Sequence, residues 1–233
     1  KSLIMHKIGI ILLENERSRS YIQKIIHNKI ILNDIILLTD NKNSKTYTLE
    51  QQTLSLQSGF KIDESVEKTL TNNNFNFKKF NFSEINHPEL IKYLKNLDSK
   101  YFIFSGGGIL KNEILNIGKK FLHLHPGIVP HFRGSTCFYY SILKNNDCGV
   151  TAFIMDENLD TGNIVLQKTF SKPNHKFIDE IYDAHIRSET LIDVLKNNLL
   201  DQENFQKQDD SIGETYFIIH PVLKHIAILN CID

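Results

Sequence analysis

Two histidines and one aspartate are the residues of this sequence whose types and spacing could do chemistry. His123 and His125 are separated by one residue in His-Leu-His-Pro-Gly, and Asp160 follows in Leu-Asp-Thr-Gly. On a strand, residues two apart point to the same face, so both imidazole rings would project together. Such a pair is compatible with acid–base catalysis, with metal binding or with a structural role. Asp160 would either orient and charge a histidine or bond its own backbone in a turn.

Metal binding would need a further ligand. Asp160 and His131 are candidates, but the sequence has no His-Glu-x-x-His and no Cys-x-x-Cys pair, so we predict no metal site. Three consecutive glycines, at residues 106–108, do not form Gly-x-Gly-x-x-Gly ahead of a long helix, and no P-loop motif occurs. Dinucleotide and P-loop binding are therefore weakly supported.

The elements that must position these residues are predicted strands. Continuous apolar runs predict strands buried on both faces at residues 7–13, 34–39, 101–104 and 121–125. Apolar residues at helical spacing predict helices between them. We therefore expect an α/β fold with a mostly parallel sheet and flanking helices. In such folds ligands bind beyond the carboxyl ends of the strands, where the glycines and histidines fall.

The C-terminal part of the sequence adds a different pattern. Residues 150–155 and 163–170 predict two strands around a turn, which would form a β-hairpin. Residues 178–200 predict one long amphipathic helix. The apolar tail at residues 222–229 would either form a homodimer contact or close the core.

Residues 40–58 are polar and predict a loop, and the stretch 40–60 could serve as a mobile lid. No low-complexity linker interrupts the chain. We predict one domain over residues 1–233, with its main part at about 1–170 and a C-terminal helix and tail at 171–233.

Composition restricts the function classes. The 233 residues contain 27 Lys and Arg and 27 Asp and Glu. Their formal net charge of zero argues against broad nucleic-acid binding, because such domains are usually basic. No run of apolar residues is long enough to predict a membrane span, and the start of the chain predicts a strand rather than a signal peptide, so the cytoplasm is the expected compartment. Three scattered cysteines predict reduced, buried thiols.

Residues 121–168 resemble the core of the folate-dependent formyltransferases, which include glycinamide ribonucleotide transformylase, methionyl-tRNA formyltransferase and the sugar N-formyltransferases. The shared pattern is Asn-x-His-Pro-[Ser/Gly]-x-x-Pro-x-[Phe/Tyr]-[Arg/Lys]-Gly, then Gly-Val-Thr, then Leu-Asp-x-Gly. The three motifs occur here in the same order. The resemblance implies a Rossmann-like formyltransferase fold and an enzyme that uses 10-formyltetrahydrofolate as co-substrate.

The resemblance also implies roles for single residues. The family's catalytic histidine and aspartate map onto His125 and Asp160, whereas its catalytic asparagine maps onto His123, the one departure. In the family, the asparagine and histidine hold the developing oxyanion, and the aspartate helps to move the proton of the attacking amine. We favour His123 as a substituted oxyanion donor because the rest of the motif is intact. The other interpretation is a reshaped site with weak or altered activity.

Two binding regions follow from the same resemblance. Arg133 would contact an anionic substrate or only brace its loop. The implied substrate-binding residues are Arg133, Gly134 and Ser135, and the implied cofactor-binding residues are Gly107, Gly108, Ile109, Leu110, Asp156 and Glu157.

The predicted substrate is a nucleotide-linked amino-dideoxy sugar, of the pseudaminic-acid type used in polysaccharide biosynthesis. The chain is too short for the C-terminal barrel of methionyl-tRNA formyltransferase and carries no net charge. Glu14 and Glu16 occupy the place of the phosphate-binding loop of glycinamide ribonucleotide transformylase and would repel a phosphate, although Arg17 and Arg19 soften this objection. Neither nucleic acid nor a membrane is an expected partner.

Four alternatives stay open. Within the family they are a glycinamide ribonucleotide formyltransferase and a formyltetrahydrofolate hydrolase. Outside it they are a folate-binding module that has lost its chemistry and a metal hydrolase using His123, His125 and Asp160. Two close imidazoles disfavour double protonation, so we expect the site to lose activity in acid.

Overall fold

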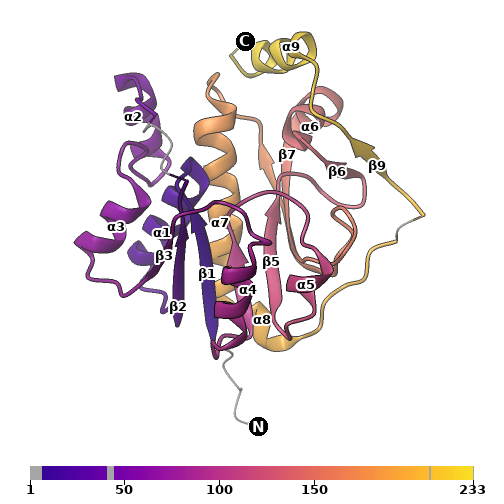
Figure 1. The fold of residues 1–233 in the computed structure, drawn as a ribbon. Helices are drawn as coiled ribbons and strands as arrows, with labels where there is room; N and C mark the ends of the chain where they lie inside the picture. Colours follow the sequence, from indigo (N-terminus) through magenta and orange to yellow (C-terminus); the bar gives the residue numbers. More distant parts are fainter. Residues whose placement is uncertain (1–6, 41–44, 210, 233) are drawn as a thin grey trace.

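A computed structural model describes residues 7–40, 45–209 and 211–232 of the chain. Its centre is a seven-stranded sheet in the order β3-β2-β1-β4-β5-β7-β8 (Figure 1). Strands β3 to β5 of this order are parallel, and β7 and β8 run antiparallel as a hairpin. The predicted mostly parallel α/β sheet and hairpin are confirmed. The strands are β1 (Ile8–Leu13), β2 (Asp34–Leu38), β3 (Lys78–Phe80), β4 (Tyr101–Phe104), β5 (Lys120–His125), β7 (Asp147–Ile154) and β8 (Ile164–Ser171).

Helices cover both faces of this sheet. The face that carries α1 and α7 lies opposite the face that carries α4 and α5 (Figure 1). The helices are α1 (Glu16–His27), α2 (Leu49–Gln57), α3 (Val66–Asn72), α4 (Pro88–Lys95), α5 (Asn112–Leu115), α6 (Cys137–Asn145), the π-helical turn η1 (Ile178–Tyr182), α7 (Asp183–Lys196), α8 (Leu199–Gln202) and α9 (Pro221–Ile232).

Alternation along the strands divides the apolar residues between two cores. On β1, Ile10 joins the core under α1 and α7, whereas Ile11 joins the core under α4 and α5. On β5, Phe121 belongs to the α4 and α5 side. His123 and His125 follow at two-residue intervals and therefore project from that same face. The strand period thus brings both imidazole rings to one side of the sheet at its carboxyl edge.

Hydrogen bonds tie the carboxyl ends of β1 and β4 together. The Ser18 and Ser105 hydroxyl oxygens are 2.6 Å apart, and the N–H of Leu13 lies 3.0 Å from the first and 3.3 Å from the second. Asn15 caps α1 by accepting the N–H of Ser18 at 2.9 Å. The start of α1 is therefore fixed beside the end of β4, where the glycine segment begins.

The loop predicted for residues 40–58 is wrong over residues 49–57, which form α2, whereas residues 45–48 are irregular as predicted. Thr48 and Gln51 make a capping box at its start, and Leu54 packs against a small core around Phe60. Glutamine and glutamate are good helix formers, so a polar composition does not distinguish a loop from an exposed helix. Residues 41–44 lie outside the described residues, and a lid at 40–60 stays a prediction.

The single helix predicted at residues 178–200 is in fact broken. It starts as η1, continues as α7 and ends before Asn198, which adopts a left-handed φ of 50° ahead of α8. Asparagine tolerates this conformation better than most residues.

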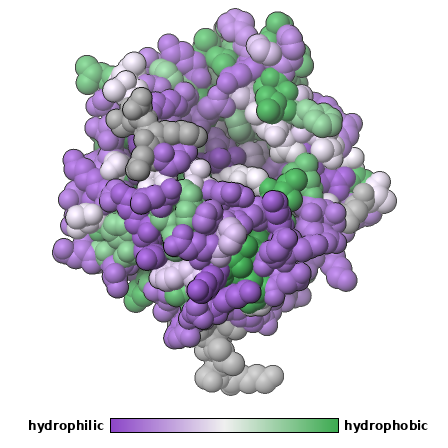
Figure 2. Space-filling view, viewed as in Figure 1, coloured by the Kyte–Doolittle hydropathy of each residue, from purple (hydrophilic) through white to green (hydrophobic). Residues whose placement is uncertain are grey.

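The C-terminal tail both closes the core and leaves an apolar face exposed. Strand β9 (Glu214–Tyr216) pairs with β6 (Phe132–Gly134), and the following α9 packs on α6. Ala227 and Cys231 of α9 are buried in the main core. The outer face of α9 carries Val222, Leu223, Ile226, Leu229 and Ile232, which form part of the apolar surface near the top of Figure 2. The homodimer stays a prediction.

Two further findings concern predicted properties of the chain. Within the described ranges, no helix is long and apolar enough to cross a membrane. Cys137, Cys148 and Cys231 are free and buried.

The turn between β7 and β8 has no room for a side chain at Gly162. A Cβ atom there would lie 1.8 Å from the Ile154 carbonyl oxygen. We expect Gly162→Ala to lower the free energy of unfolding by about 2 kcal/mol or more, because backbone must move. Gly107→Ala is the matched control: its Cβ meets nothing within 4 Å, so the change should stay within about 0.5 kcal/mol. Urea denaturation measures both, and equal effects would contradict the prediction.

Candidate active site

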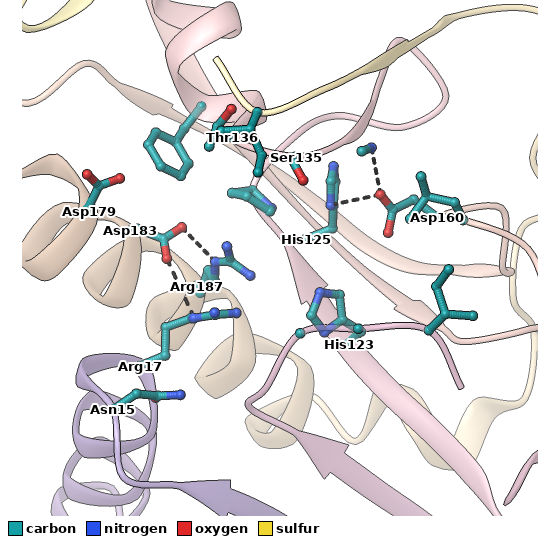
Figure 3. Close-up of a pocket in the computed structure, with 18 of the residues that line it drawn as sticks. Asn15, Arg17, His123, His125, Ser135, Thr136, Asp160, Asp179, Asp183 and Arg187 are labelled. Carbon is teal, nitrogen blue, oxygen red and sulfur yellow. Dashed lines mark hydrogen bonds and ion pairs between the residues drawn. The ribbon is translucent and has the colours of Figure 1, made fainter. Parts of the chain in front are cut away.

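A cavity of about 580 Å³ opens at the carboxyl edge of the sheet. Figure 2 shows the hollow on the face below α9, and Figure 3 shows side chains converging on it from β5, α1, α7 and the turn after β7. It collects most of the residues singled out in the sequence: Gly107, Gly108, Ile109, His123, His125, Gly134, Ser135 and Asp160.

His125 and Asp160 form a buried pair. Nδ1 of His125 is 3.3 Å from Oδ2 of Asp160, and that oxygen also accepts the N–H of Gly134 at 2.7 Å. The other ring nitrogen, Nε2, lies 2.8 Å from the Phe132 carbonyl oxygen. Both nitrogens of His125 therefore face oxygen acceptors, although a neutral ring carries only one N–H.

This arrangement leaves the pair one proton short. Burial lowers the pKa of His125, while the negative charge of Asp160 acts in the opposite direction. When the ring is neutral, one of its nitrogens faces an oxygen without a proton between them. A proton delivered to the pair fills that position, so the geometry is suited to accept one.

The loop that carries Asp160 is held by backbone geometry and by one glutamine. Asp160 has a left-handed φ of 55°, a conformation that aspartate tolerates better than most residues. The Gln208 side-chain amide donates to the carbonyl oxygens of Asp160 at 3.0 Å and Gly162 at 2.7 Å. Gln208 comes from the tail, and no motif in the sequence pointed to it.

His123 differs from His125 in having an unused nitrogen. Its Nδ1 is buried and has no hydrogen-bond partner within the part of the chain that the structure describes. Burial lowers the pKa of His123 well below 6.5, and the positive charges of Arg187 and Arg17 act in the same direction. His123 is therefore neutral at pH 7, and one of its nitrogens has no partner in the described part of the chain.

A charged cluster that sequence reasoning missed forms another wall of the cavity. Nε of Arg187 donates to Oδ1 of Asp183 at 2.7 Å, and Nε of Arg17 lies 3.8 Å from Oδ2 of the same carboxylate (Figure 3). The sequence did hold a signal for it. Asp183 and Arg187 stand one turn apart on a helix whose other buried residues are uncharged, and a charged pair on a buried stripe seldom lacks a role.

The structure places the predicted cofactor-binding residues in two adjoining cavities and on one exposed loop. Gly107, Gly108 and Ile109 line the main cavity. Leu110 and Asp156 line a narrow second cavity that shares Gly108, Ile109 and Asp160 with the first. Glu157 is exposed on the loop between β7 and β8.

The predicted substrate-binding residues are likewise divided. Gly134 and Ser135 line the cavity, and the backbone of Gly134 binds Asp160. Arg133 points elsewhere, because its guanidinium donates to the Ile212 carbonyl oxygen at 3.1 Å and so braces the tail segment before β9. A substrate contact by Arg133 stays a prediction.

One carboxylate expected to repel a phosphate is turned away from the cavity. Glu14 pairs with Arg19 at 3.0 Å and accepts the Val66 N–H at the start of α3. Glu16 does line the cavity, but it accepts hydrogen bonds from Lys45 and Tyr47, both at 2.9 Å. The predicted repulsion therefore rests on Glu16 alone, and its charge is partly compensated.

The cavity does not assemble a metal-ligand set from the residues that the structure describes: no three His, Cys, Asp or Glu side chains there are grouped for one ion. His131, the third ligand considered from the sequence, lines a separate cavity near β9.

The fold and site define a class of protein: a Rossmann-like α/β chain with a His–Asp pair at the carboxyl edge of its sheet. The sequence profile of the formyl transferase family matches residues 35–192. The chain belongs to this family.

Individual relatives agree with the family. Methionyl-tRNA formyltransferase from Clostridium perfringens (strain 13 / Type A) is 32% identical over 130 residues, covering 54% of this chain and 42% of that protein. The chain thus spans less than half the length of the curated relative. Among solved structures, an N-formyltransferase from Helicobacter canadensis has a TM-score of 0.62 at 17% identity, covering 98% of this chain and 81% of that one. A sugar N-formyltransferase from Shewanella sp FDAARGOS_354 has a TM-score of 0.60 at 19% identity, covering 97% and 87%. At these identities the two structures establish the fold.

The lowered pKa of His123 makes stability depend on pH. Below about pH 6.5 the unfolded chain binds a proton that the native His123 does not, so the free energy of unfolding falls as pH decreases. The slope from one such histidine is about 1.4 kcal/mol per pH unit. We expect His123→Asn to reduce the slope by up to that amount in urea denaturation series from pH 7.5 to 5.5. His27→Asn, at an exposed position of α1, should keep the wild-type slope. Parallel curves for wild type and His123→Asn would contradict the assignment.

Proposed function

We propose that this chain transfers a formyl group from 10-formyltetrahydrofolate to the amino group of a nucleotide-linked amino-dideoxy sugar. One observation carries the proposal. A buried pair suited to accept a proton, His125 and Asp160, shares a cavity with a neutral histidine that has a nitrogen to spare. Acyl transfer to an amine requires these two functions, a proton acceptor and an oxyanion donor.

The His125–Asp160 pair would take the proton of the amine. As the amine nitrogen forms its bond to the formyl carbon, it becomes more acidic and must release a proton. The pair can take up that proton because a ring nitrogen of His125 and Oδ2 of Asp160 then share it. When the bond between the formyl carbon and the folate nitrogen breaks, the same proton can pass to the departing nitrogen.

His123 would stabilise the negative oxygen of the tetrahedral intermediate. A neutral imidazole with its hydrogen on Nδ1 is a hydrogen-bond donor at an atom that has no partner among the described residues, and in this tautomer the Phe104 carbonyl faces the other ring nitrogen without a proton. An oxyanion binds strongly to a donor that is already fixed and shielded from water. Burial supplies the shielding, since His123 is only 9% exposed, and its ring packs edge-on against Phe153 with centroids 5.8 Å apart.

Folate binding would use the wall formed by Gly107, Gly108 and Ile109. No side chains stand over the two glycines, since an added Cβ at either position meets nothing within 4 Å. Ile109 and Leu159 present exposed apolar surface at the cavity, which suits a flat ring system. Asp156 and Leu110 would line the deeper end, while Glu157 would act from outside.

The preference for a sugar nucleotide rests on two kinds of support. The Helicobacter canadensis structure is described as a complex with folinic acid and dTDP-3-aminofucose, and its fold covers nearly all of this chain. Arg17 and Arg187 also line the cavity and would contact an anionic part of the substrate, although the lining holds more carboxylates than arginines. Methionyl-tRNA is the second candidate because the sequence relatives carry that name.

We expect Asp160→Asn to lower kcat/KM for formyl transfer by about 10²- to 10⁴-fold, because the amide cannot accept the amine proton. The experiment combines the purified chain, 10-formyltetrahydrofolate and a panel of UDP-, dTDP- and GDP-linked amino sugars, with methionyl-tRNA as a separate arm. Absorbance follows tetrahydrofolate release, and mass spectrometry detects the formylated product. Asp193→Asn, which removes a carboxylate that pairs with Lys168 away from the cavity, is the matched control.

Each outcome of this assay selects one function. A formylated sugar whose formation needs Asp160 supports the proposal and identifies the substrate. Formylation of methionyl-tRNA alone would replace it with the second candidate. Tetrahydrofolate release without a formylated product would indicate a hydrolase, and folate binding without turnover would indicate a binding module.

The oxyanion role of His123 gives a separate prediction. We expect His123→Ala to lower kcat by about 10²- to 10³-fold, the usual cost of removing one oxyanion donor. His123→Asn should stay within about tenfold of wild type, because an amide N–H also donates without charge. Steady-state kinetics with the substrate identified above measures both. Equal losses in the two variants would contradict a donor role for this position.

A further inference from the structure

Arg187 is a buried cation that reaches the end of β5 from the opposite side of the sheet. Its Nη1 donates to the Leu124 carbonyl oxygen at 2.5 Å, and its Nε donates to Asp183 at 2.7 Å. Leu124 is the residue between His123 and His125. The side chain is only 7% exposed, so its charge is screened little by water.

We propose that Arg187 is a positioning residue for the two histidines: bound to the Leu124 carbonyl and held by Asp183, it fixes the end of β5 and keeps a positive charge beside both rings. The inference deepens the proposed function and rests on it for its catalytic meaning.

The sheet gives a geometric reason for this contact. Strand β4 pairs with β5 only as far as Leu122, so the last residues of β5 lack that neighbour. On the other side, β7 still pairs with His123 and His125. The bond from Arg187 therefore supplies a fixed partner to a strand end that the parallel sheet no longer holds.

Charge gives a second reason. Arg187 is the largest charged contribution that lowers the pKa of His123, and it lowers the pKa of His125 as well. Asp160 and Asp183 act in the opposite direction on His125. The charged groups that face the rings are Arg17 from α1, Asp183 and Arg187 from α7, and Asp160 from the turn after β7; the Cys137 thiol at the start of α6 is kept neutral by burial, which raises its pKa to about 12.

The lowered pKa values of His123 and His125 both serve the proposed formyl transfer. A neutral His123 presents an N–H without attracting the carboxylates of the cavity, and a neutral His125 keeps the pair with Asp160 ready to accept a proton. A buried arginine can do this without titrating itself, because its guanidinium stays charged in proteins.

The test is a histidine titration that does not depend on turnover. The chain contains ten histidines, and NMR signals of the imidazole rings are assigned to His123 and His125 with single His→Asn variants. We expect Arg187→Gln to raise the titration midpoints of His123 and His125 by about one pH unit, the scale of one neighbouring charge. Arg187→Lys should shift the midpoints less, because lysine keeps the positive charge and lacks only the planar guanidinium with its several N–H donors.

Two further variants keep the test decisive. Arg19→Gln is the matched control: Arg19 is equally buried and bonds to Glu14 and the Ile62 carbonyl rather than to the histidine strand. It should lower stability without moving either midpoint. Asp183→Asn should shift the His125 midpoint downward, since the Asp183 charge raises that pKa. This opposite shift is measurable even if Arg187→Gln does not fold.

The results separate this inference from the proposed function. Midpoints that stay in place in Arg187→Gln, or in Asp183→Asn where the first variant does not fold, would overturn the inference and leave Arg187 a packing residue like Arg19. Shifted midpoints in a chain that transfers no formyl group would uphold the inference and refute the proposed function. If the inference and the proposed function both hold, the pH below which the rate of formyl transfer falls should be higher in Arg187→Gln. The increase should equal the shift of the titration midpoints.

Discussion

The contact between His125 and Asp160 exists only because two parts of the chain far apart in sequence are folded over the end of one strand. His125 closes β5, and Asp160 lies in the turn between β7 and β8. Strand β7 pairs antiparallel with β5 and runs from His125 back to Leu122, and the turn after β7 then folds over the strand so that the carboxylate meets the ring. Gly134 and Gln208 hold the Asp160 loop from two further segments. The rest of the site is arranged around this buried, proton-deficient pair.

Burying so many polar groups at one edge requires that each has a partner or a use. Arg187 and Arg17 share the carboxylate of Asp183, and Glu14 is diverted into a cap for α3. An isolated buried charge would be costly, so these pairings are what permit a charged cavity in the middle of an α/β fold. Among the side chains that line the cavity, Nδ1 of His123 is buried without a partner in the described part of the chain. A buried polar atom without a partner calls for an explanation, and a role toward a ligand is the one proposed here.

The strands and the candidate residues His123, His125 and Asp160 could be predicted from the sequence because both leave local signals. Strands buried on both faces appear as continuous apolar runs, and the motifs around His125 and Asp160 are contiguous in sequence. Sequence reasoning failed at α2, where exposed polar residues resemble a loop, and at the break after α7, which depends on a left-handed Asn198. It also missed Arg187 and Gln208. Their roles arise from tertiary contacts with Leu124, Asp160 and Gly162, and no short-range pattern encodes such contacts.

The histidine at position 123 becomes understandable from this charge arrangement. The motif that residues 121–168 resemble has asparagine at this position, a donor that never carries a full charge. A histidine could replace it only where its ring stays neutral, since an imidazolium would pair with the nearby carboxylates instead of waiting for a substrate oxygen. Burial and two arginines provide that condition by lowering its pKa. The substitution, the burial of the ring and the cluster on α7 are therefore best regarded as one feature, because burial and the positive charges together keep this histidine uncharged like an amide.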